Sequence, residues 1–278
     1  QSGLAGIRQL RILDDSLADD TRLEAFALEV QKLHETLIST PMQFLVIAED
    51  HKVTDVARDI STLWSQVSTG EDRPRFQMTP IREQRGEIWL TNTQVNFCAR
   101  AYPTVTEQHP DAAALTVLGG FLRNGFLHRA IREQGGAYGG GASHDSGIAA
   151  FRFYSYRDPR LVETLQDFDA SVSWLLDTSH DDRSLEEAIL GVIGSMDKPG
   201  SPAGEAKQHF HNRLFGRNHE TRERFRENIL GVSLDDLRRV TETYLRPDLA
   251  STAIVTNSGQ LEATASLREE LNLTVQEL

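Results

Sequence analysis

The most informative stretch of this 278-residue sequence is residues 131–143, where five glycines surround a tyrosine and follow an arginine. The order IREQGGAYGGGAS places Arg132 shortly before Tyr138. A guanidinium group and a phenol hydroxyl are both hydrogen-bond donors. Together they could bind a carbonyl oxygen, or stabilise the negative charge that develops on it when a peptide bond is attacked.

The glycines of this stretch have a structural and a functional interpretation. Gly135 or Gly136 can end a helix in the left-handed conformation, and Arg132 in the last turn suits the helix dipole. That interpretation explains two glycines but not all five. Repeated glycine in a strand often marks a close approach of another backbone, so an edge without side chains could accept an extended peptide as an added strand. Both interpretations remain open. No Lys-Ser/Thr follows the glycines and no strand precedes them, which excludes a phosphate-binding loop and a dinucleotide fingerprint.

The histidines do not form a metal-binding motif. A zincin needs two histidines on one helical face with a nearby glutamate, as H-E-x-x-H or H-x-x-E-H. His34 and His219 are each followed by glutamate, but neither completes such a motif. His209 and His211 are two residues apart and would lie on different sides of a helix. We therefore expect no metal site within this chain.

Nucleophilic catalysis has equally little support. Ser143, His144 and Asp145 are adjacent in the sequence, whereas triads are assembled from distant segments and adjacent side chains in a strand point to opposite faces. We interpret these three as turn residues. Cys98 alternates with Phe97 and is interpreted as a small buried thiol, with a catalytic thiol as the alternative.

Periodicity predicts the elements that must position these residues. Apolar residues at spacings of three and four predict helices, and alternation or short apolar runs predict strands. Strands followed by helices indicate an α+β fold, in which a mixed or antiparallel sheet is covered by several helices. The capping box from Ser184 to Glu187 and the start at Ser233 mark two helix N-termini. The predicted helices are 21–44, one after the strand 42–48, 112–132, 161–176, 184–196, 203–214, 221–230, 233–245 and 259–271; the predicted strands are 42–48, two within 87–102, 148–156 and 251–256.

The order helix, strand, helix occurs at both ends of the chain. This similarity suggests two related domains, of which the first is represented by its end. We therefore interpret residues 1–66 as the C-terminal part of a preceding α+β domain and 67–86 as a linker, because that segment is polar and contains proline and glycine. Residues 87–278 are then a complete domain.

Composition excludes several classes of protein. The sequence is 39% hydrophobic and 25% charged, which is typical of a folded globular chain. A formal net charge of -12 disfavours binding to nucleic acid or anionic membranes. The single cysteine excludes an internal disulfide and fits a reducing compartment. Residues 1–15 lack the apolar region of a signal peptide, and no 18-residue apolar run exists, so we expect neither secretion nor membrane insertion.

The segment FLRNGFLHRAIREQGGAYGGG, residues 121–141, resembles the R-E-x-G-G-A-Y-G signature in the last domain of the pitrilysin or insulinase type of zinc metallopeptidases. The presequence-protease branch is the most similar. The run NTQVNF at 92–97 and the aromatic strand ending in YRDP at 156–159 fit this resemblance, which spans most of 67–278.

The resemblance implies an enzyme of two halves that close around an unfolded peptide. The N-terminal half would bind zinc, and the C-terminal half would contribute Arg132 and Tyr138 as catalytic residues. Gly135, Gly136, Ala137 and Gly139 would bind substrate. The zinc motif is missing here, so the resemblance implies the C-terminal part of such a protease, inactive alone, with the N-terminal half of the same protease as partner.

Two alternatives stay open beside this hypothesis. One is a non-catalytic scaffold or peptide-binding subunit of the same fold, since a fold does not certify activity. The other is an independent peptide-binding domain. The expected compartment is a bacterial cytoplasm or an organelle matrix.

Overall fold

The computed structural model describes residues 3–65, 67, 79, 81–198, 200–260 and 264–277. The chain divides into two compact units, Gln1–Ile81 with Pro199–Arg217 and Arg82–Lys198 with Asn218–Leu278. Most of the predicted linker 67–86 lies outside the described residues. That residues 1–66 are the end of a homologous domain stays a prediction.

The first unit consists of helices whose apolar side chains are largely exposed. Helix α2 starts one residue earlier than expected, because the Asp19 side chain accepts a hydrogen bond from the Arg22 backbone N–H at 3.0 Å. No side chain of its first three helices is buried, and Leu33 is 59% exposed. The helices of this unit are α1 (Gly3–Ser16), α2 (Asp20–Ile38), α3 (Asp50–Trp64) and α7 (Pro202–Leu214).

The strand expected at 42–48 is wrong. Residues 41–49 form no strand, because the described part of the chain offers them no neighbouring strand to pair with. Phe44 instead packs edge-on against Trp64 of α3, with ring centroids 5.0 Å apart. An apolar run signals burial but does not by itself supply a hydrogen-bonding partner.

The second unit is built on a mixed sheet, six-stranded within the described residues. Its strands are β1 (Gly86–Leu90), β2 (Asn96–Pro103), β3 (Gly139–Asp145), β4 (Ala150–Asp158), β5 (Ser251–Thr256) and β6 (Thr274–Glu277). Their order across the sheet is β3-β4-β2-β5-β1-β6. Strand β1 runs parallel to β5 and β6, and the other pairs are antiparallel. The α+β prediction with a mixed sheet is confirmed.

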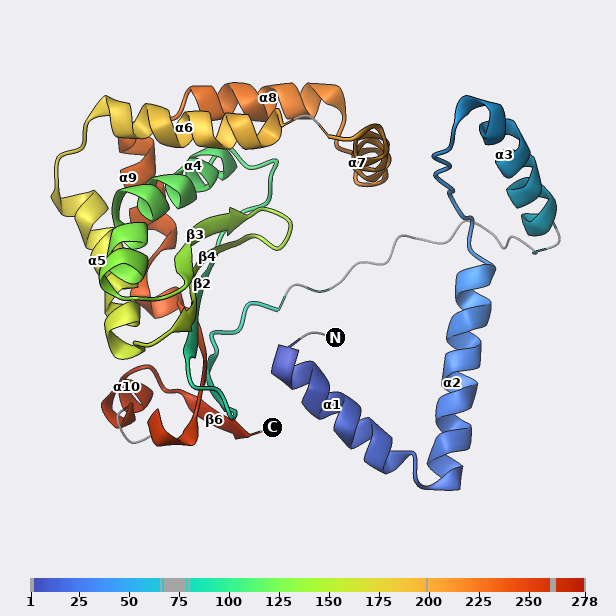
Figure 1. Ribbon diagram of the computed structural model, residues 1–278, viewed down its shortest axis with the longest axis horizontal. Coiled ribbons are helices and arrows are strands. Elements are labelled where there is room, and N and C mark those ends of the chain that lie inside the picture. Colours follow the sequence, from blue (N-terminus) through green and yellow to red (C-terminus); the bar gives the residue numbers. More distant parts are fainter. Residues whose placement is uncertain are drawn as a thin grey trace. The chain divides into compact units, whose positions relative to one another are not determined.

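Helices of the second unit cover one face of this sheet, and the other face is open within the described residues of that unit (Figure 1). Along β2 and β4, Cys98 and Phe153 are buried, whereas their neighbours Phe97 and Arg152 are exposed. Period-two alternation therefore separates a core face from a free face. The helices and helical turns of this unit are α4 (Ala112–Leu122), η1 (Arg123–Gln134), α5 (Val162–Asp177), α6 (Asp182–Met196), α8 (His219–Leu230), α9 (Leu234–Tyr244), η2 (Pro247–Leu249), η3 (Ser258–Gln260) and α10 (Ala265–Glu270).

Two expectations about these elements need correction, and one strand, β6, was not predicted. The continuous helix 112–132 is an α-helix followed by a π-helix, η1, in which the buried residues Leu127 and Ile131 follow Leu122 at spacings of five and four. The capping box at Ser184 is wrong: Asp181 caps α6, and its carboxylate accepts hydrogen bonds from the Ser184 backbone N–H and hydroxyl at 2.9 and 2.6 Å. Strand β6 is too short to give a sequence signal. The start at Ser233 is confirmed as a capping box with Asp236.

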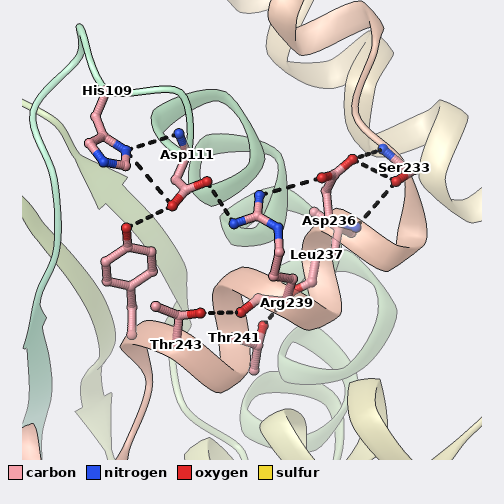
Figure 2. Close-up of polar contacts among 9 residues, drawn as sticks. His109, Asp111, Ser233, Asp236, Leu237, Arg239, Thr241 and Thr243 are labelled. Atoms are coloured by element: carbon pink, nitrogen blue, oxygen red, sulfur yellow. Dashed lines mark hydrogen bonds and ion pairs between the residues drawn. The ribbon is translucent and has the colours of Figure 1, made fainter.

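A network of polar contacts fastens α9 to the N-terminus of α4 (Figure 2). The Tyr244 hydroxyl donates to Asp111 Oδ2 at 2.7 Å, and Arg239 Nη1 lies 2.8 Å from Asp111 Oδ1. Burial alone would raise the pKa of Asp111, but the hydrogen bonds from Tyr244 and Arg239 outweigh it and lower that pKa. Burial, together with the hydrogen bond to Asp111, raises the pKa of Tyr244 to about 12.

We expect Tyr244→Phe to lower the free energy of unfolding by about 1.5–3 kcal/mol, the usual contribution of a hydrogen bond to a charged group. Because the pKa of Tyr244 is raised on folding, its contribution is full below its unfolded pKa near 10 and is lost as the pH rises through about 12. Denaturant unfolding of wild type and variant at pH 7 and above pH 11 measures the loss of stability and its dependence on pH. The difference between wild type and variant should shrink at the higher pH. An equal difference at both pH values contradicts the assignment.

Candidate functional site

The turn from η1 into β3 carries the sequence-predicted site. Gly135 ends the helix, and Gly136 has φ +77. The Gly136 backbone N–H donates to the Arg132 carbonyl at 3.1 Å, which is the left-handed helix ending predicted from the glycines. The structural interpretation of these two glycines is thus confirmed.

A side chain from beyond β4 fixes the end of η1. Arg160 Nη2 donates to the Ala130 carbonyl at 3.1 Å and to Asp167 at 2.8 Å. A Cβ atom at Gly135 would lie 2.0 Å from Arg160 Nη2 and 2.5 Å from the Ile131 carbonyl oxygen. Gly135 is therefore required chiefly because a Cβ atom would clash with the Ile131 backbone carbonyl; the Arg160 guanidinium, which donates to the Ala130 carbonyl, also occupies this space.

Neighbouring residues of this chain explain why β3 contains glycines. A Cβ at Gly139 would lie 2.5 Å from Tyr156 Oη, and one at Gly140 would lie 2.8 Å from Ile131 Cγ2. Side chains of neighbouring elements, and not the backbone of another molecule, take the vacated space. A close backbone approach does occur at Gly119 of α4, whose Cβ would lie 2.9 Å from Ser143 Cα. Glycine thus lets α4 and η1 pack directly on β3.

Strand β3 lies at the edge of the sheet. Among the described strands it pairs only with β4. Its other backbone edge therefore has no strand partner within the described residues. Such an edge is the geometry that strand addition of a peptide requires. The substrate-binding role of Gly135, Gly136, Ala137 and Gly139 stays a prediction.

Arg132 and Tyr138 lie at the two ends of this turn with their polar groups exposed. The Arg132 side chain is exposed, and that of Tyr138 is 63% exposed. Within the part of the chain that the structure describes, neither the Arg132 guanidinium nor the Tyr138 hydroxyl has a hydrogen-bond or ion-pair partner. Both donors are therefore available to a ligand.

The Tyr138 ring contacts two residues at the end of β4. Its centroid lies 5.6 Å from that of Tyr156, and Arg157 Cζ lies over it at 5.6 Å. The Tyr138 backbone N–H also donates to the Arg157 carbonyl at 3.3 Å. These contacts hold the ring of Tyr138 and leave its hydroxyl free.

A β-bulge places Arg157 beside Tyr138. The register of β2 against β4 shifts between Asn96 and Cys98, so that Tyr156 and Arg157 together lie opposite Phe97. Arg157 has φ +50, which non-glycine residues rarely adopt. A bulge bends its strand and redirects a side chain. No pattern in the amino-acid sequence indicates this bulge.

Buried polar groups anchor the residue that follows the bulge. Asp158 is fully buried, and its carboxylate accepts hydrogen bonds from the Thr164 hydroxyl at 2.8 Å and the Arg160 backbone N–H at 2.9 Å. The Asn96 side-chain amide donates to the Asp158 carbonyl at 3.2 Å and accepts from the Thr256 hydroxyl at 2.6 Å. Sequence reasoning missed this network. The network could have been suspected from Asp158, an aspartate between an aromatic strand and Pro159.

The remaining candidates take structural positions. Burial raises the pKa of the Cys98 thiol to about 12, which makes it a poor nucleophile. The interpretation of Ser143, His144 and Asp145 as turn residues is wrong, because β3 continues through Asp145, which pairs with Ala150.

The described residues contain neither a cluster of metal ligands nor a membrane-spanning helix. No group of three or more histidine, cysteine, aspartate or glutamate side chains is placed there so that it could hold a metal ion. Within the same residues, no helix is long and apolar enough to cross a membrane.

The fold is that of the pitrilysin-type peptidases. The crystal structure of pitrilysin matches 82% of this chain and 25% of its own, with a TM-score of 0.61 and 16% identity. The structure titled peptidase M16 inactive domain from Pseudomonas fluorescens matches 74% of this chain and 51% of its own, with a TM-score of 0.58 and 15% identity. At these identities the matches show the fold alone.

Sequence comparison gives the family. Residues 86–254 match the family model of the PreP C-terminal domain, and the chain belongs to that family. The mitochondrial presequence protease of Kluyveromyces lactis is 32% identical over 265 residues, which cover 91% of this chain and 26% of that protein. The chain thus spans about a quarter of this relative's length.

Proposed function

We propose that this chain is the C-terminal part of a zinc metalloendopeptidase that degrades short unfolded peptides of the targeting type. The observation that carries the proposal is the pair Arg132 and Tyr138, whose exposed donors flank one turn at an edge strand in a PreP C-terminal domain. The chain spans 26% of a relative named presequence protease, which supports the view that the rest of the enzyme lies outside it.

The chemistry assigned to this chain is binding and charge stabilisation. The peptide backbone pairs with the free edge of β3 next to Gly135, Gly136, Ala137 and Gly139. The Arg132 guanidinium and the Tyr138 hydroxyl then donate hydrogen bonds to the carbonyl oxygen of the peptide bond as it becomes negative. Zinc, when bound in such an enzyme, activates water. The described residues hold no cluster that fits a zinc ion, so we place its ligands outside this chain.

The partners follow from the same proposal. Besides the peptide substrate, the chain needs the N-terminal half of the protease. Large apolar side chains exposed on α1 to α3, such as Ile7, Leu33 and Val53, support packing of these helices against other protein. The relatives' name favours an organelle matrix over a bacterial cytoplasm.

A non-catalytic scaffold is the second candidate. It is favoured by the shared fold with a domain titled inactive. The coding sequence upstream of Gln1 separates the two: H-x-x-E-H with a later glutamate supports the protease, and its absence supports the scaffold.

Cleavage of a fluorogenic unfolded peptide tests the proposal. We expect no cleavage by the chain alone and steady cleavage by the full-length protein. A chelator should abolish that activity and added zinc should restore it, because the zinc that activates water would be held by ligands outside this chain. A chelator-insensitive or absent activity of the full-length protein contradicts the proposal.

A further inference from the structure

The backbone of Arg157 is strained at a place where the fold needs no turn. In the described residues, three non-glycine residues have positive φ: Ala149, Arg157 and Asn272. Ala149 and Asn272 lie in turns, whereas Arg157 lies inside β4. Strain of this kind persists only where the surroundings enforce it, and it concentrates at functional sites.

The surroundings hold Arg157 from both sides. Its carbonyl accepts a hydrogen bond from the Tyr138 backbone N–H at 3.3 Å. The next residue, Asp158, is fully buried and bound through its carboxylate to Thr164 and to the Arg160 backbone. The bulge therefore cannot relax into regular strand without breaking buried hydrogen bonds.

An arginine side chain is unfavourable at the backbone conformation of residue 157. Glycine or asparagine would adopt φ +50 at lower cost. The exposed Arg157 guanidinium has no carboxylate partner within the described residues, and its recorded contact is the face of Tyr138 at 5.6 Å. A cation above an aromatic face is attracted to it. The strain thus serves to bring a cation to this ring.

We propose that Arg157 is a positioning residue for Tyr138. Its guanidinium, seated by the bulge, orients the Tyr138 ring so that the hydroxyl points at the substrate carbonyl. This inference rests on the proposed function, because it assigns Arg157 a role that acts through Tyr138.

The test compares variants of the full-length protein with matched zinc content. Arg157→Gln keeps a side chain of similar length on the same backbone and removes the charge. We expect kcat to fall about two- to fivefold, the rate equivalent of an exposed cation–π contact, with KM changed less than about twofold. Arg157→Lys should recover most of the loss. Arg157→Gly, which suits φ +50, should keep the fold and lose kcat like the glutamine variant.

A double-mutant cycle shows whether Arg157 acts through the ring. In a Tyr138→Ala background, Arg157→Gln should cause no further loss. An equal loss in that background, or wild-type kcat in the Gln and Gly variants, overturns the proposal. Arg152→Gln is the control, because Arg152 is exposed on the same strand and pairs with Asp145 at 3.2 Å instead.

The two proposals fail in different ways. If Tyr138→Phe is slow and Arg157→Gln is not, only the role of Arg157 is lost. If Tyr138→Phe turns over like wild type, the catalytic role of Tyr138 and the positioning role of Arg157 are both overturned. The proposed peptidase function itself fails only if the full-length protein does not cleave the peptide or is insensitive to a chelator.

Discussion

Tyr138→Phe in the full-length protein is expected to lower kcat at least tenfold without loss of zinc. Removal of one oxyanion donor usually costs about 10²–10³ in rate. The phenylalanine ring keeps the contacts with Tyr156 and Arg157, so the change removes the hydroxyl alone. Because that hydroxyl has no partner within the described residues, its loss leaves no buried group unsatisfied. Steady-state kinetics and metal analysis of the same preparation measure both quantities.

Tyr154→Phe is the matched control for this variant. Tyr154 lies on the same strand as Tyr156 and loses the same atom, but it pairs with Ala99 and Gly141, away from the Tyr138 ring. Its kcat should stay close to that of wild type. Wild-type turnover by Tyr138→Phe with zinc retained excludes the hydroxyl from catalysis.

Phe153→Ala is expected to lower the free energy of unfolding by about 3–5 kcal/mol, the usual cost of truncating a buried phenylalanine. Phe153 is fully buried and stacks on Phe168 at 5.4 Å, and its ring also meets Phe151 at 5.3 Å and Tyr102 at 6.1 Å. Its loss opens a cavity between the sheet and α5. Denaturant unfolding of the chain gives the change.

The adjacent Arg152 provides the comparison. It points to the open face, and Arg152→Ala should change the free energy of unfolding by less than about 0.5–1 kcal/mol, because its ion pair with Asp145 is exposed. Equal effects of Phe153→Ala and Arg152→Ala would contradict the assignment of the core face. Strand β4 also carries Tyr156 and Arg157, which contact Tyr138. In the full-length protein, Phe153→Ala should therefore reduce activity by lowering the fraction of molecules that are folded.

Periodicity was a good guide where an element has one buried face. The alternation along β2 and β4 is the alternation of burial in the structure, and β5 has the predicted bounds. It failed where hydrogen-bonding partners decide. Residues 42–48 are apolar enough for a strand but have no strand to pair with among the described residues. The π-helix η1 was also missed, although its buried residues Leu127 and Ile131 follow Leu122 at spacings of five and four, which fits the wider turn of a π-helix.

The sequence by itself determined the α+β class and the family resemblance, because these depend on local pattern and on residue type, and it predicts Arg132 and Tyr138 as the site pair. The tertiary structure decided why the glycines are there and what surrounds the tyrosine. At Gly135 a Cβ atom would meet the Ile131 carbonyl and the Arg160 guanidinium, which folding brings to the helix end. Arg157 meets Tyr138 only because an extra residue in β4 shifts its register against β2. Such contacts join residues far apart in the chain, so a local pattern in the sequence cannot predict them.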